Sequence, residues 1–440
     1  MFRKRIQAST IAIIVVISAC LFIDFSLKLW EKPDRVIEWD IHSHYAYLPA
    51  FFIYDDIQLT KSDYHFDNDY YLFWQSVTPD GKNVIKTSMG MSIMYAPFFF
   101  VAHGFCLLTD YPENGFSEPY KVFLLLSTIF YLIIGLDYVR KILQHFKFSD
   151  LHISITILLI GIGTNVLCYS SQSAPLPHVY DFSLIAIFMF YTIRWYEIQS
   201  VKNTIILGVV LGLITLIRPT NIIILIFFAL YNVSNWTELK QRVILLKYKW
   251  FLINVIFCLA LLIWIPQFIY WKTVTGDYFY YSYTGERFFF NNPELMEGLF
   301  GFHKGWLVYT PMMGFSLIGM FMLRGATKKV RAAIILFFIV NVYIIFSWWC
   351  WWYGGTFGQR AMIDCYPLLA IPFTSFVQYL SGRKWVLKGI VICIAGFFIW
   401  LNIFQTFQFE YHSLHWDGIP RNFTLSNSGR WLLLRILICI

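Results

Sequence analysis

Charged residues are scarce in this chain. Only 14% of its 440 residues are Asp, Glu, Lys or Arg, whereas 58% are hydrophobic and 20% are aromatic. A soluble domain of this length carries much more charge on its surface. The composition therefore excludes a soluble globular protein and predicts an integral membrane protein.

The cysteines also lack any pattern that would indicate a metal site or a disulfide framework. None of the eight stands in a Cys-X-X-Cys motif, and all lie in apolar stretches or at their edges. The net charge of +8 is spread over many loops and does not indicate a partner nucleic acid. The distribution of basic residues is explained more simply by the orientation of the chain in the membrane, since Lys and Arg gather in cytoplasmic loops.

Long apolar segments recur along the chain, separated by short charged or aromatic stretches. This pattern predicts an all-α fold, a polytopic bundle of transmembrane helices. The basic start "MFRKR" precedes a long apolar run with no clear cleavage site, which predicts a retained first span rather than a signal peptide. Hydropathy predicts about eleven spans, near residues 8–29, 119–139, 151–168, 179–193, 203–217, 220–233, 250–270, 306–323, 332–347, 361–380 and 385–404.

The apolar segment 89–108 decides the orientation of everything after it. It is apolar enough to cross the membrane but contains Pro97 and His103. With the N-terminus taken as cytoplasmic, the short loops rich in Lys and Arg all lie on the cytoplasmic side only if this segment does not cross. The positive-inside rule therefore favours a re-entrant or interfacial helix at 89–108. We expect one membrane domain over 1–404, followed by an extracytoplasmic tail at 405–440. Two large outer loops are expected in this domain, at 30–118 and at 271–305, and the loop at 30–118 should contain interfacial helices.

The stretch "VIEWDIHSHYAYLPAFFIYDD", residues 36–56, follows the first span and carries the first candidate site. Asp40 and His44 are spaced i, i+4 and share one face if the segment is helical, with Tyr45 beside them. A carboxylate there can accept a proton in a transition state. The same spacing suits a solvated juxtamembrane helix, and Asp40 with His42 and His44 could instead hold a divalent metal. The residues leave these alternatives open.

Basic residues predicted on the outer side form a second candidate set. Lys86, Arg218, Lys304 and Arg360 would approach one outer cavity, with His178 at its edge, and together they suit a lipid phosphate group. Arg218 stands in "IRPTN", where a charge near the interface needs an anionic partner. A snorkelling role for Lys86 and a structural role for His178 are the alternatives.

The order of these motifs resembles a known family. "DIHSHYAYLPAFFIYDD", "MGMSIMYAPFFFVAH", "PHVYDF", "RPTN" and "WWYGGTFGQRAMIDCYPLLAIP" are similar to segments of the GT-C glycosyltransferases. The most similar branch is family 39, which includes protein O-mannosyltransferases and aminoarabinose transferases, in its members from Bacteroidetes-type bacteria. The resemblance extends to about residue 405.

The resemblance implies a GT-C-like glycosyltransferase of the bacterial inner (cytoplasmic) membrane, acting at its extracytoplasmic face. The donor would be a polyprenyl-phosphate sugar and the acceptor a lipid, a glycan or a protein. The family's catalytic carboxylate maps onto Asp40, which would act as general base in an inverting transfer. The family often has an Asp-Glu pair here, but this chain has Ile41 and His42 after Asp40, so the use of a metal stays open.

Two other functions fit a polytopic membrane protein. A flippase or transporter of lipid-linked sugars would show repeats and ionisable residues at mid-membrane, and we find no repeat of fixed period. A polymerase or ligase of surface polysaccharide also carries a large outer loop with Arg and His. The donor distinguishes it, since that class uses a diphosphate-linked oligosaccharide.

Overall fold

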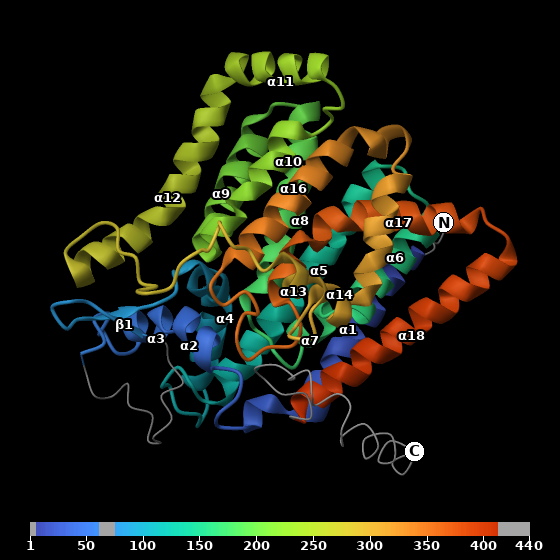
Figure 1. Ribbon diagram of the computed structural model, residues 1–440. Coiled ribbons are helices and arrows are strands. Elements are labelled where there is room, and N and C mark those ends of the chain that lie inside the picture. Colours follow the sequence, from blue (N-terminus) through green and yellow to red (C-terminus); the bar gives the residue numbers. More distant parts are fainter. Residues whose placement is uncertain (1–5, 61–74, 412–440) are drawn as a thin grey trace, which may run out of the picture.

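The computed structural model describes residues 6–60 and 75–411. Helices make up most of this part of the chain (Figure 1). An antiparallel pair of short strands, β1 Gln75–Val77 and β2 Asn83–Ile85, lies in the first long loop. The fold is therefore all-α apart from this hairpin, which the sequence did not predict.

The first half of the chain holds the long first loop between two apolar helices. Its helical elements are α1 Ala8–Leu27, η1 Leu29–Glu31, α2 Trp39–Tyr45, α3 Tyr47–Phe52, α4 Gly90–Cys106, α5 Glu118–His145, α6 Asp150–Gly163, α7 Val166–Tyr169, α8 Pro177–Glu197 and α9 Val201–Ile217. Helix starts follow local chemistry. The side chains of Ser149 and Ser200 accept backbone N–H groups at the starts of α6 and α9, and Pro177 opens α8.

The second half contains more interrupted helices. They are η3 Pro219–Ile224, α10 Leu225–Leu230, α11 Trp236–Tyr248, α12 Trp250–Thr275, α13 Leu295–Phe300, α14 Trp306–Tyr309, η4 Pro311–Met313, α15 Gly314–Gly319, η5 Met320–Met322, η6 Gly325–Val330, α16 Arg331–Ser347, η7 Arg360–Cys365, α17 Tyr366–Ser381 and α18 Trp385–Glu410. The expected span at 306–323 is thus four short pieces, because Pro311 supplies no N–H to continue α14.

Five helical segments in the described residues are long and apolar enough to cross a membrane. They are Ala8–Glu31, Glu118–His145, Trp250–Thr275, Gly325–Ser347 and Trp385–Glu410. In α12 and α18 only 17% and 11% of the most apolar stretch is buried inside the protein. Apolar side chains exposed along whole helices need a non-aqueous surrounding, so the protein is embedded in a membrane.

Small residues let the central helices approach closely. Helix α9 packs against α8 on one side and α12 on the other. A Cβ atom on Gly208 would lie 2.8 Å from the Ile256 carbonyl oxygen, and one on Gly212 would lie 2.9 Å from that of Ala260. The two glycines are four residues apart, so they form one groove into which the α12 backbone fits.

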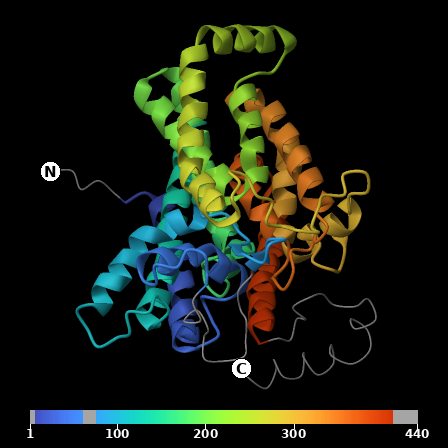
Figure 2. The ribbon, with the colours of Figure 1, turned by 90° about the vertical axis from the view of Figure 1, so that its left-hand side faces the viewer.

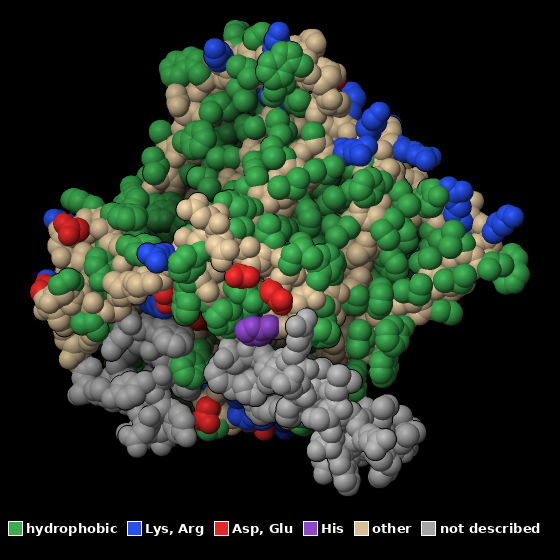
Figure 3. Space-filling view, viewed as in Figure 1, with side chains coloured by type: hydrophobic (Ala, Val, Ile, Leu, Met, Phe, Trp, Pro, Cys, Tyr) green, Lys and Arg blue, Asp and Glu red, His purple; other side chains and the backbone are tan. Residues whose placement is uncertain are grey.

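The two ends of the bundle differ in character. One end, here called the basic end, carries α11, η6 and the α17–α18 connection, and Lys and Arg side chains line it (Figure 3). The opposite end, here called the loop end, carries α2, α3, α4, the hairpin and the connections 276–305 and 348–359 (Figures 1 and 2). Helix α18 continues to Glu410, beyond the expected end of the last span. The rest of the expected tail lies outside the described residues.

Candidate functional site

Helix α2 presents the carboxylate predicted as the reactive group. The segment is helical, so Asp40 and His44 lie one turn apart as the spacing predicted. Most of α2 is packed inward, since Ile41 and His44 are buried, whereas the Asp40 side chain is 37% exposed. The carboxylate is therefore accessible from the loop end.

Arg360 is the main partner of Asp40. Its Nη2 donates to Asp40 Oδ2 at 2.6 Å, and the guanidinium side chain is only 12% exposed. Burial alone would raise the pKa of Asp40. The charge and hydrogen bond of Arg360, helped by His44 and Lys86, outweigh burial and hold this pKa below its usual value. Asp40 is thus ionised at neutral pH and able to accept a proton.

Lys86 lies beside this pair and has its own anionic partner. It follows strand β2, whose Ile85 N–H donates to the Tyr270 hydroxyl at 2.8 Å. The Lys86 ammonium forms an ion pair with Glu286 and lies 5.2 Å from the centre of the Tyr283 ring. We call Asp40, Arg360, Lys86 and Glu286 the outer cluster; it contains two cations and two carboxylates.

A second group of charged residues lies deeper in the protein. Arg218 Nη1 donates to Asp364 Oδ2 at 2.7 Å, and His178 Nδ1 lies 3.0 Å from Asp364 Oδ1. The amide of Asn221 donates both to Asp364 at 3.0 Å and to Asp181 at 3.1 Å. We call these five residues the inner cluster. The break between α9 and η3 places Arg218 there, because Pro219 ends the helix.

Two features join the clusters. The short helix η7 carries both Arg360, which contacts Asp40, and Asp364, which contacts Arg218. The Tyr353 ring lies between the two arginines, with its centre 5.5 Å from the Arg218 guanidinium and 5.9 Å from that of Arg360. Movement of η7 would therefore change both ion pairs at once.

Lys304, predicted to approach a lipid phosphate, and Tyr45, predicted to lie beside Asp40 and His44, both contact backbone carbonyl groups of the protein. Lys304 is buried and its ammonium donates to the Gly354 carbonyl, in the loop that leads to Arg360. The Tyr45 hydroxyl donates to the Gly115 carbonyl at 2.5 Å, and its ring packs against Phe99 and other aromatic rings. These contacts place Lys304 under the loop and Tyr45 in the core.

His44 is suited to act as an uncharged imidazole. Burial, with smaller contributions from the charges of Arg360 and His178, lowers its pKa to about 4 against the opposing effect of Asp40. Its Nδ1 has no hydrogen-bond partner among the described residues. Within 6–60 and 75–411, no three His, Cys, Asp or Glu side chains, including the proposed Asp40, His42 and His44, form a group that could hold a metal ion.

Sequence analysis identified Asp40, Lys86, His178, Arg218 and Arg360, and it missed several of their partners. Asp364 lies four residues after Arg360 in "GQRAMIDC", and this spacing was its only local signal. Other missed residues are Glu286, Tyr283, Tyr353 and Asn221. Tyr353 and Asn221 lie inside the quoted motifs "WWYGGTFGQRAMIDCYPLLAIP" and "RPTN" but were not singled out there, and the sequences around Glu286 and Tyr283 show no distinguishing pattern.

Comparison with models of known protein families and with curated proteins gives no match to this chain. The two charged clusters are therefore the features of this chain from which a function can be inferred.

Proposed function

We propose that this protein is an integral-membrane glycosyltransferase, which moves a monosaccharide from a polyprenyl-phosphate donor to a lipid, glycan or protein acceptor. The observation that carries the proposal is the accessible, ionised Asp40 held against Arg360, with Lys86 beside it. A base next to cations is the combination that transfer from a phosphate-linked sugar requires.

In this reaction Asp40 would accept the proton of the acceptor hydroxyl as its oxygen attacks the anomeric carbon. The bond between that carbon and the phosphate oxygen breaks, and polyprenyl phosphate leaves with the bonding electron pair. Attack from the opposite side inverts the configuration. The leaving phosphate needs cations rather than a proton, and Arg360 and Lys86 would supply them.

The ion pairs of the outer cluster give this proposal a specific feature. Arg360 and Lys86 each contact a carboxylate of the protein, Asp40 and Glu286 respectively. A donor phosphate would compete for both cations, because it can bind the Arg360 guanidinium in a bidentate manner and the Lys86 ammonium through charge-assisted hydrogen bonds. Binding of the donor would then release Asp40 from Arg360 and make it more basic. The base would become active only in the presence of the donor.

The proposal includes a GT-C-like fold with about eleven spans, with the N-terminus in the cytoplasm of a bacterial inner membrane. The gathering of Lys and Arg at the basic end supports this orientation (Figure 3). The loop end, with the outer cluster, would then face outward, where a lipid-linked sugar is presented. Part of the first outer loop, residues 61–74, lies outside the described residues.

The test is release of polyprenyl phosphate from a panel of polyprenyl-phosphate sugars, using membranes that contain the protein and a membrane extract as acceptor. Wild type should consume one donor, whereas Asp40→Asn should not. The matched control is Asp80→Asn, a carboxylate in the same loop that is exposed and pairs with Lys82 at 3.1 Å. It should behave as wild type.

Full activity of Asp40→Asn would refute the role of Asp40. No consumption of any donor by folded wild type would contradict the transferase. Diphosphate-linked oligosaccharides and labelled lipid in liposomes would then test the polymerase or ligase and the transporter.

A further inference from the structure

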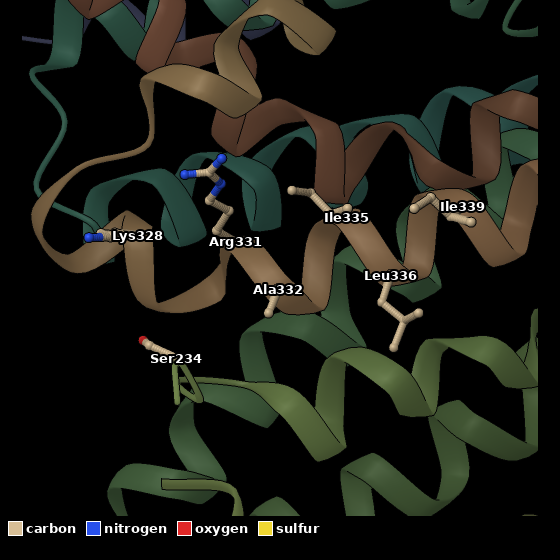
Figure 4. A pocket seen from close by; sticks show the side chains of 7 residues that line it. All are labelled: Ser234, Lys328, Arg331, Ala332, Ile335, Leu336 and Ile339. Atoms are coloured by element: carbon tan, nitrogen blue, oxygen red, sulfur yellow. The ribbon is translucent and has the colours of Figure 1, made fainter. Parts of the chain in front are cut away.

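A groove opens at the basic end, away from both charged clusters. It has a volume of about 330 Å³ and lies between the loop before α11 and the first turns of α16. Lys328, Arg331 and Ser234 form one end of it, and Ala332, Leu336 and Ile339 continue along α16 (Figure 4). The groove is thus polar and cationic at one end and apolar along the rest.

The cations at this groove lack anionic partners in the described part of the chain. No carboxylate there lies within 4.0 Å of the side-chain nitrogens of Lys328, Lys329 or Arg331. Glu238, in the first turn of α11, accepts the backbone N–H of Ser234 at 2.6 Å instead. Lys328 and Arg331, the two cations that line the groove, are therefore available to an external anion.

The depth of the groove matches the boundary between headgroups and acyl chains. Gly325–Ser347 is one of the segments apolar enough to cross a membrane, and the groove follows its first turns. From Ala332 to Ile339 an α-helix rises by about 10 Å. The cationic end thus lies where the span begins, and the apolar part lies deeper along the same helix.

Helix α11 independently places this end at a membrane surface. It lies across the end of the bundle (Figure 1), and none of its residues is buried. Trp236, Ile244 and Tyr248 are exposed on it together with Lys240 and Lys247. An exposed helix with aromatic, aliphatic and basic side chains is typical of an interfacial helix. Ser234 at the groove lies two residues before its start.

We propose that this groove binds an anionic phospholipid. The phosphate of its headgroup would contact Lys328, Arg331 and the Ser234 hydroxyl, and one acyl chain would lie along Ala332, Leu336 and Ile339. A basic pocket beside an apolar helix surface is the kind of site that recognises anionic headgroups. The inference does not depend on the proposed glycosyltransferase function.

The experiment is native mass spectrometry of the full-length protein in mild detergent, titrated with phosphatidylglycerol, phosphatidylcholine or inorganic phosphate. Each basic residue near a membrane surface contributes about fivefold to the binding of anionic lipid. Lys328→Ala with Arg331→Ala should therefore weaken binding of phosphatidylglycerol about 25-fold. Arg383→Ala with Lys384→Ala is the matched control, because both are exposed cations in the α17–α18 connection. This pair should leave binding unchanged.

Ala332→Trp tests the acyl part of the groove. The indole would occupy the space along α16 without removing a charge, so binding should fall while both cations remain. Equal binding of phosphatidylcholine would overturn the proposal, as would equal losses in the groove and control pairs. Inorganic phosphate that displaces the lipid completely at millimolar concentration would show an anion site without a lipid groove, and would also overturn it.

Discussion

The inner cluster contains two aspartates that hydrogen-bond to the same amide, and substitution by Asn should destabilise the protein much more at one of them than at the other. Asp364 pairs with Arg218 and is 1% exposed, while Arg218 is 16% exposed. Asp181 is also buried, but its Oδ2 accepts only from Asn221 and its Oδ1 has no partner among the described residues. Asp364→Asn removes the counter-charge of Arg218, whereas Asp181→Asn leaves the ion pair between Arg218 and Asp364 in place.

The expected magnitudes differ accordingly. Removing one partner of a buried ion pair costs about 3–5 kcal/mol, because the remaining charge is buried without compensation. Asn retains one oxygen that can accept from Arg218, so we expect about 3 kcal/mol for Asp364→Asn. Asp181→Asn has no cation to leave unpaired and keeps a similar shape. It should change the free energy of unfolding by less than about 1 kcal/mol.

The assay is unfolding of each variant in mild detergent by added dodecyl sulfate, followed by tryptophan fluorescence. Arg218→Met combined with Asp364→Leu should be more stable than Asp364→Asn, because the double variant buries no unpaired charge. Equal losses for Asp364→Asn and Asp181→Asn would refute this reasoning, since both sites are buried and contact Asn221, whereas Asp364 also contacts Arg218 and His178.

Three further predictions concern the loop end. In Arg360→Gln, burial becomes the dominant influence on Asp40 and raises its pKa. When donor consumption is measured against pH, its decline on the acid side should therefore occur at higher pH than in wild type. An unchanged decline would contradict this. Burial raises the pKa of Glu38 from 4.5 to about 7, so the folded state binds this proton more tightly than the unfolded state does. Stability should therefore fall as the pH rises between these values. Glu38→Gln should reduce this dependence of the thermal unfolding temperature on pH. A Cβ on Gly90 would lie 2.5 Å from the Ile217 backbone nitrogen. Gly90→Ala should therefore lower the free energy of unfolding by about 1–3 kcal/mol in the dodecyl sulfate assay. Unchanged stability would contradict the close packing of α4 on α9.

Long apolar helices could be predicted from the sequence, because length and hydropathy are local properties. Residues 8–29 and 250–270 were expected as spans, and α1 and α12 are apolar helices there. The expected segment 306–323 is interrupted because Pro311 and the packing of α15 against α17 act against one continuous helix. Hydropathy averages over such breaks. The boundary of α5 at His145 also lies beyond the expected 139, since a helix can continue past its apolar part.

The candidate site could be predicted only in part. The spacing of Asp40 and His44 requires only that the segment is helical, and it is. The pairing of Asp40 with Arg360 joins residues 320 positions apart, and no local pattern encodes it. Sequence analysis grouped Arg218 with Arg360 through their shared charge. In the structure they occupy different clusters, with Tyr353 between them.

The separation of Asp40 and Arg360 along the chain has a consequence for biosynthesis. Helix α2 is made 320 residues before its counter-charge. At typical rates of 5–20 residues per second, roughly 16–64 s of translation separates them. Throughout that interval the first long loop carries a carboxylate whose partner Arg360 has not yet been made. A ribosome that stalls before residue 360 would leave this loop unassembled, and the cell's quality-control proteases would meet the nascent chain in that state.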